Sequence, residues 1–139
     1  MVMLITGEKG KGKTRHLIDK VNTEVKKVNG SIVFLDKSTK HMFELNNRIR
    51  LIDVSEFELK DPDEFAGFVS GIISQDHDLE QMYIDNILKL SQASDDQIEP
   101  MILRLEDIGK KWGVDFVIDI SKDEKELSEK LREKIIISL

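Results

Sequence analysis

The stretch Gly7-Glu8-Lys9-Gly10-Lys11-Gly12-Lys13-Thr14 directly follows the apolar run Val2–Ile5. Its spacing, G-x-x-x-x-G-K-T, is typical of a phosphate-binding loop between a buried strand and a helix. The glycines let backbone N–H groups surround a phosphate, and the helix that follows directs its positive dipole end at the same anion. We therefore expect nucleotide phosphates to be bound by Gly7, Glu8, Lys9, Gly10, Lys11, Gly12, Lys13, Thr14 and Arg15.

Two side chains of this stretch have distinct expected roles. Lys13 would place a positive charge on the β- and γ-phosphates and so act in catalysis, and the Thr14 hydroxyl is suited to bind Mg²⁺. The expected cofactors are therefore ATP and Mg²⁺. The alternative is a surface turn rich in glycine and lysine, but the position between strand and helix favours the phosphate loop.

Size and composition indicate one domain, covering residues 1–139. A chain of 139 residues with 40% apolar residues is sufficient for one core. It has no cysteine, which excludes disulfides and thiolate chemistry and favours an intracellular compartment. No leader pattern and no apolar run of membrane-spanning length is present, so we expect a cytoplasmic protein without membrane insertion.

The charge balance makes nucleic acid an unexpected partner. The formal net charge is −6 and the pI is about 5.1, whereas nucleic-acid binding needs a basic face. Lys9, Lys11, Lys13 and Arg15 nevertheless form one positive region at the phosphate loop. A nucleotide is the expected ligand, and an unknown protein partner or a homo-oligomer remains open.

Apolar runs of strand character alternate with helical patterns along the whole chain. Strands are expected at residues 2–6, 31–36, 48–54, 81–87, 114–120 and 135–139. Alternation of this kind implies right-handed βαβ units. The predicted fold class is α/β, a three-layer α/β/α sandwich with a mostly parallel central sheet of five to six strands.

Helix boundaries are marked by capping residues and glycines. Asp61 with Glu64, Ser94 with Gln97, and Ser121 with Glu124 have the spacing of capping boxes. Gly30 and Gly113 are placed as C-terminal helix stops. The polar segment 37–47 is expected to hold only a short helix or turn around Met42, Phe43 and Leu45.

A nucleotide-hydrolysing site needs a second acid near the phosphate loop to hold the Mg²⁺ water shell. Four acids end apolar strand-like runs: Asp36, Asp53, Asp85 and Asp119. We favour Asp85, because the extra crossover before its strand allows that strand to lie in the sheet centre; Asp36 is next. Thr14 and Asp85 are thus the expected metal ligands.

Asn86 follows the favoured acid, at a position where many ATPases of this architecture have a glutamate. An amide can orient water but accepts a proton poorly, which predicts slow hydrolysis. Either Asn86 only positions water, as part of a catalytic set with Lys13 and Asp85, or the base comes from elsewhere. Glu8, Glu44, Glu56 and Asp53 are the open possibilities.

The sequence indicates a functional role less strongly for Ser121 and for the histidines. Ser121 would sense the γ-phosphate if its strand lies between those of Thr6 and Asp85, and the capping role explains it equally well. His41 and His77 lie in polar segments without carboxylate partners at metal-ligand spacing, so no metal other than nucleotide-bound Mg²⁺ is expected. No Asn-Lys-x-Asp motif is present, and adenine is therefore the default base.

Gly7–Thr14 and, more loosely, Tyr83-Ile84-Asp85 resemble the motifs of the P-loop NTPase superfamily. At this size the chain also looks like short, uncharacterised bacterial ATP-binding proteins, some of which are labelled twitching-motility or pilus-retraction ATPases. The likeness to pilus-retraction ATPases is confined to the loop. The resemblance implies a P-loop NTPase fold and nucleotide binding.

Three functions are compatible with these observations. The first is Mg²⁺-dependent ATP binding with weak hydrolysis, in a nucleotide-dependent switch or a partner subunit. The second is a phosphotransferase for a small molecule or nucleotide, with an acceptor pocket built from residues 37–60, although the arginine-rich lid usual in small kinases is not evident. The third is a nucleotide-binding module without hydrolysis.

Overall fold

The structure is a computed structural model that describes residues 1–139. Its centre is a sheet of six strands: β1 (Val2–Thr6), β2 (Ser31–Asp36), β3 (Ile49–Asp53), β4 (Leu79–Ile84), β5 (Asp115–Ile120) and β6 (Ile135–Ser138). Their spatial order is β3-β2-β4-β5-β1-β6, and every neighbouring pair is parallel. The expected α/β fold is confirmed, and the sheet is entirely rather than mostly parallel.

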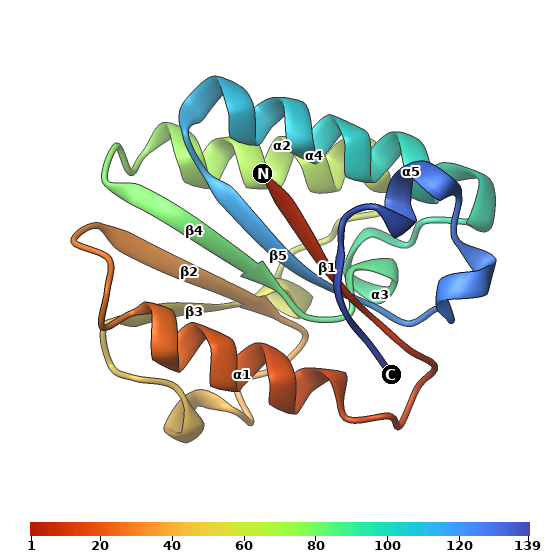
Figure 1. Ribbon diagram of the computed structural model, residues 1–139. Helices are drawn as coiled ribbons and strands as arrows, with labels where there is room; N and C mark the ends of the chain where they lie inside the picture. The colour runs from red at the N-terminus through yellow and green to blue at the C-terminus, as the bar shows by residue number, and fades with distance from the viewer.

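Helices cover both faces of this sheet (Figure 1). Helix α1 (Lys13–Glu24) lies on one face, and α2 (Pro62–Ser74), α3 (Ile87–Ser91) and α4 (Ile98–Trp112) lie on the other. The short helix α5 (Glu129–Arg132) precedes β6. Single turns of 3₁₀ helix occupy Met42–Glu44, Val54–Glu56, Asp95–Gln97 and Glu124–Glu126.

The two helix layers enclose two separate cores because side chains alternate along each strand. In β2, Val33 and Leu35 belong to the larger core beneath α2 and α4. The intervening Ile32 and Phe34 belong to the smaller core beneath α1. Burial on both faces explains why the strands read as continuous apolar runs.

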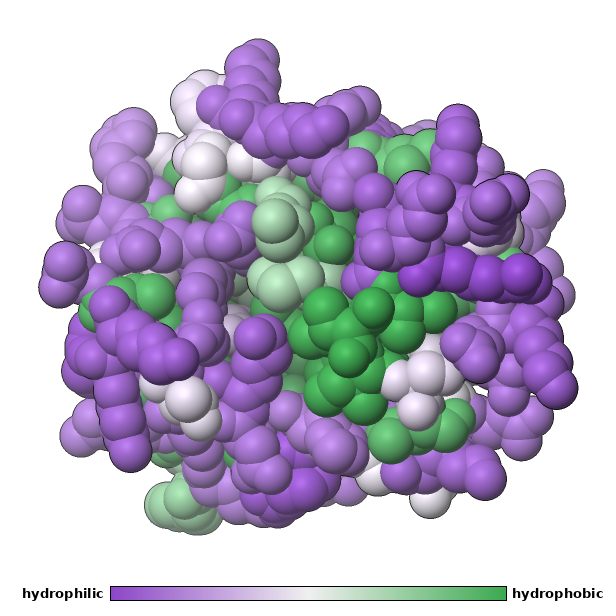
Figure 2. All heavy atoms as spheres, in the orientation of Figure 1, coloured by the Kyte–Doolittle hydropathy of each residue, from purple (hydrophilic) through white to green (hydrophobic).

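The outer surface is predominantly polar, as Figure 2 shows for one face. A hydrophobic area near the centre of that view lies where Figure 1 places β1 and β6, and Ile136 of β6 is half exposed. No helix is both long enough and apolar enough to span a membrane.

Several local predictions are confirmed. Asp61 caps α2 by accepting a hydrogen bond from the Glu64 N–H at 2.9 Å. Ser94 and Gln97 form a capping box before α4, and Gly113 ends that helix with φ of 69°. The strand expected near the sheet edge is β3, which is one of the two edge strands.

Three local predictions are wrong. The strand expected at 81–87 is Leu79–Ile84, and Ile87 already starts α3. Ser121 and Glu124 do not form a capping box, because Asp123 and Glu126 do.

The third wrong prediction is that Gly30 ends a helix, because α1 already ends at Glu24, six positions earlier. A Cβ atom at Gly30 would lie 2.0 Å from the carbonyl oxygen of Asp78. Glycine is therefore needed there for close approach between chain segments rather than for helix termination.

Candidate functional site

The phosphate-loop residues form a compact turn between β1 and α1. Gly10 and Gly12 have φ values of 89° and 90°, which only glycine adopts readily. The backbone N–H groups of Gly12, Lys13 and Thr14 donate to no other group of the chain. Free donors at the start of a twelve-residue helix are suited to an anionic ligand.

Lys13 is held inside this turn. Its side chain is 6% exposed, and its ammonium group donates to the carbonyl oxygen of Glu8 at 3.0 Å. That carbonyl is the only hydrogen-bond acceptor that Nζ contacts, so two of its three N–H donors are free for a ligand.

The strand order brings Asp85 to the phosphate loop. Asp85 follows β4, which is separated from β1 only by β5, and the Thr14 hydroxyl donates to its Oδ1 at 3.0 Å. The two predicted Mg²⁺ ligands, far apart in sequence, are thus in direct contact. Asp85 is 5% exposed.

A polar pocket of about 190 Å³ opens at these strand ends. None of its lining side chains is hydrophobic: Lys9, Gly10, Gly12, Lys13, Thr14, Asp36, Lys37, Lys40, His41, Asp85, Asn86, Asp119 and Ser121. This lining fits phosphates and a hydrated cation better than a nucleobase.

Two further strand-end acids share the pocket with Asp85. Asp36 and Asp119 are almost completely buried, and each has one carboxylate oxygen without a hydrogen-bond partner. Burial, followed by the nearby Asp85, raises the pKa of Asp119 to about 8. Burial likewise raises the pKa of Asp36, although its Oδ1 accepts from the Lys37 N–H at 2.7 Å.

This donor set fits Mg²⁺ that is completed by phosphate oxygens. A hydroxyl, a neighbouring carboxylate and unpartnered carboxylate oxygens are the oxygen ligands that Mg²⁺ prefers. The chain has no group of three acidic or histidine side chains arranged to hold an ion alone. Thr14 and Asp85 would therefore hold Mg²⁺ together with a bound nucleotide, where it would neutralise phosphate charge.

Asn86 connects the ends of β4 and β5. It has a left-handed backbone with φ of 53°, unusual for a residue other than glycine, and such strain is common at functional sites. Its Oδ1 accepts from the Ser121 hydroxyl at 3.3 Å. Strand β5 lies between β1 and β4, so the positional condition set for Ser121 as a phosphate sensor is met.

The segment after β2 supplies two lysines and a histidine to the pocket, which the sequence did not indicate. Lys37, Lys40 and His41 line it. His41 also contacts a carboxylate, since its Nδ1 lies 2.6 Å from Glu44 Oε2. The place of these three residues in the pocket could have been predicted from one feature of the sequence, since they directly follow a strand that ends in an acid.

Some predicted residues lie outside the pocket lining. Gly7, Glu8, Lys11 and Arg15 do not line it; Arg15 pairs with Glu44 and Asp19. His41 and then Arg15 lower the pKa of Glu44.

Of the other base possibilities, Asp53 accepts from Ser55, and Glu8 and Glu56 are exposed. None of the four acids named as alternative bases lines the pocket.

Comparison with known proteins defines the fold. No protein-family model and no curated protein matches the chain. A solved KaiC-like protein from the hyperthermophilic archaeon Pyrococcus horikoshii OT3 matches with a TM-score of 0.61 and 16% identity over 85% of this chain. The chain spans 61% of that structure's length.

At this identity the likeness shows the fold alone, an all-parallel α/β fold of six strands similar to that KaiC-like protein. The fold agrees with the expected α/β architecture, with helices on both faces of a parallel sheet. Nothing in these comparisons supports a twitching-motility label.

Proposed function

We propose that this chain binds ATP with Mg²⁺ in the polar pocket and hydrolyses it slowly, as a nucleotide-dependent switch or as a partner subunit. The observation that carries the proposal is the contact between Thr14 and Asp85 at 3.0 Å beside the free N–H groups of the phosphate loop. One loop thereby presents anion donors and a cation site to the same ligand.

Each residue of the pocket has a role in this proposal. Lys13 binds the β- and γ-phosphates, and Thr14 and Asp85 hold Mg²⁺. Asn86 and Ser121 orient the water that attacks the terminal phosphate, since both present hydrogen-bonding groups at adjacent strand ends. Adenine is proposed only because the chain lacks a guanine-recognition motif.

Slow hydrolysis follows from the position of Asn86. A carboxylate there would accept the proton of the attacking water, whereas an amide cannot. Asp119 does not replace it readily, because burial and the nearby Asp85 raise the pKa of Asp119 to about 8. A partner would be needed for fast turnover.

Isothermal titration with ATP, ADP and GTP in the presence of Mg²⁺, followed by phosphate release, tests the proposal. We expect binding of adenine nucleotides and turnover far below the roughly 10 s⁻¹ of a typical enzyme. Turnover at tens per second without a partner would contradict slow hydrolysis. Binding without any phosphate release would identify a non-hydrolysing module.

A phosphotransferase is the second candidate function. It is favoured by a second pocket, built largely from residues 54–60, that shares Lys37 with the polar pocket. Lys37 and Lys40 also supply cations in the phosphate pocket, where small kinases use arginines. Loss of the γ-phosphate only when an acceptor is added would support this candidate over hydrolysis.

A further inference from the structure

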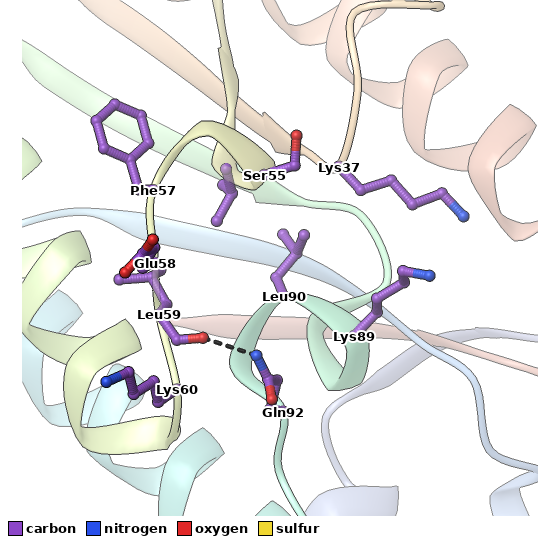
Figure 3. Close-up of a pocket in the computed structure, with 10 residues that line it drawn as sticks. Lys37, Ser55, Phe57, Glu58, Leu59, Lys60, Lys89, Leu90 and Gln92 are labelled. Atoms are coloured by element: carbon purple, nitrogen blue, oxygen red, sulfur yellow. Dashed lines mark hydrogen bonds between the residues drawn. The ribbon is translucent and has the colours of Figure 1, made fainter.

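The second pocket lies at the same edge of the sheet as the phosphate site, where β2, β3 and β4 end. Lys37 follows β2, Val54–Lys60 follow β3, and Lys89–Gln92 belong to α3 and its end, after β4. Figure 3 shows these three segments facing one another across the pocket. Its volume is about 360 Å³, within the range of small-molecule sites.

The floor of this pocket is apolar. Val54 and Leu90 are 2% and 6% exposed, and Leu59 and Phe57 add apolar surface beside them. Gln92 closes one side, because its Nε2 donates to the carbonyl oxygen of Leu59 at 2.8 Å (Figure 3). The backbone of Gln92 is left-handed, with φ of 55°, so this contact holds a strained residue in place.

The rim of the pocket is cationic. Lys37, Lys60 and Lys89 line it, and none of them forms an ion pair with a carboxylate of the chain. Glu58 is the only acid in the lining. In Figure 3 the side chains of Lys37 and Lys89 extend toward the same side of the pocket.

Such a rim is unusual in an acidic protein. The net charge of the whole chain is −6, but three lysines against one glutamate leave this lining with a charge of +2. A local positive field over an apolar floor attracts anions that carry an apolar body.

We propose that this pocket binds a small anionic molecule whose aromatic or aliphatic body lies on Val54 and Leu90 and whose phosphate or carboxylate group lies between Lys37 and Lys89. The site is distinct from the nucleotide pocket and shares only Lys37 with it. Binding does not depend on hydrolysis, whereas use of the ligand as a second substrate rests on the proposed nucleotide site.

The probe for this site is 1-naphthyl phosphate, which combines an aromatic body with a phosphate. Backbone amide NMR shifts of the full chain are followed during titration with saturating ADP and Mg²⁺ present, so that the phosphate loop is occupied. The uncharged 1-naphthalenemethanol is titrated in parallel. Lys89→Glu is the test variant, since Lys89 is exposed and does not line the nucleotide pocket.

Lys26→Glu is the matched control, because Lys26 is also exposed, lines neither pocket and forms no ion pair. We expect saturable shifts at Val54, Leu59 and Leu90, and affinity that is about fivefold weaker in Lys89→Glu but unchanged in Lys26→Glu. ADP affinity should be the same in both variants, which shows that the fold and the nucleotide site are intact.

Three results would overturn the proposal. These are the absence of saturable shifts at Val54, Leu59 and Leu90 when ADP is present, equal affinity for the uncharged alcohol, and equal affinity of Lys89→Glu and Lys26→Glu for the probe. Failure of the proposed nucleotide site can be distinguished from failure of this pocket. In that case ADP would not bind, while the probe would still shift the amide signals of Val54 and Leu90.

Discussion

Lys13 is buried in the phosphate loop, yet its ammonium group contacts only one carbonyl oxygen of the chain. Replacing it by alanine removes a charged donor from the ligand and little from the core. We expect Lys13→Ala to weaken ATP binding by about a hundredfold or more, because hydrogen bonds between charged groups are the strongest in such sites. Titration calorimetry measures the affinity.

Lys11→Ala is the matched control, since Lys11 belongs to the same loop but is exposed and does not line the pocket. Thermal unfolding of both variants should resemble that of the wild type. Equal loss of affinity in the two variants would mean that the loop binds through its overall charge and not through Lys13.

Asp85 and Asp36 both line the pocket, but only Asp85 contacts Thr14. We expect Asp85→Ala to weaken ATP binding in Mg²⁺ and to leave binding in EDTA nearly unchanged, because the variant lacks one cation ligand. Asp36→Ala should leave ATP binding unchanged both in Mg²⁺ and in EDTA. If Asp36→Ala alone removes the Mg²⁺ dependence, Asp36 is the second acid.

Asp119 makes the stability of the unliganded protein depend on pH. Its pKa of about 8 in the folded chain lies above the roughly 3.9 of an unfolded aspartate, so the folded state holds an extra proton between these values. The unfolding free energy of the wild type therefore loses a contribution as pH rises through this window. The side-chain amide of the Asp119→Asn variant cannot ionise, so the variant lacks this dependence.

The stability of Asp119→Asn relative to wild type should thus increase from pH 5 to pH 8, measured by urea unfolding without nucleotide or Mg²⁺. Acids that do not interact with Asp119 are common to both proteins and cancel in this difference, whereas its neighbour Asp85 contributes to it. A difference that stays constant over this range would show that Asp119 titrates normally.

At the level of elements, the sequence predicted those features that depend on local pattern. The phosphate loop, the strand positions at β1 and β2, and the caps at Asp61, Ser94 and Gly113 follow from apolar runs and capping residues. Asp85 was also correctly placed beside the loop.

The features that were missed depend on tertiary contacts. The predicted strand was extended to Ile87, which is the first residue of helix α3, and the break between strand and helix is made by the left-handed backbone of Asn86. The placement of Lys37 and His41 in the pocket depends on how the segment after β2 folds back over the sheet edge. No periodicity in the sequence encodes such a placement.

Gly109 and Gly67 are a matched pair of helical glycines. A Cβ at Gly109 in α4 would lie 2.5 Å from the carbonyl oxygen of Val114, whereas a Cβ at Gly67 in α2 has no neighbour within 4 Å. We expect Gly109→Ala to cost about 1–3 kcal/mol through overpacking and Gly67→Ala to gain about 0.5–1 kcal/mol through helix propensity. Urea unfolding measures both.

This pair tests whether α4 packs on β5 as closely as the structure shows. If both substitutions stabilise the protein, the end of α4 is further from β5 than described.

In the whole molecule, both pockets open at the edge where the parallel strands end. This follows from topology, because all six strands run in the same direction and the segments after β1, β2, β4 and β5 meet at one edge. At the other end of the strands, the segments before β2 and β4 approach closely at Gly30 and Asp78. A ligand in either pocket would therefore contact several loops at once.

Because the ligand contacts loops from several strands, binding should stabilise the whole domain against unfolding. At an ATP concentration of about 100 times Kd, linkage predicts a gain of about 2.7 kcal/mol, or a rise in Tm of roughly 5–10 °C for a domain of this size. Differential scanning calorimetry with Mg²⁺ and ATP measures this shift. Lys13→Ala should lose the shift, and Lys11→Ala should keep it. An undiminished rise in Tm in Lys13→Ala would place the stabilising nucleotide outside the phosphate loop.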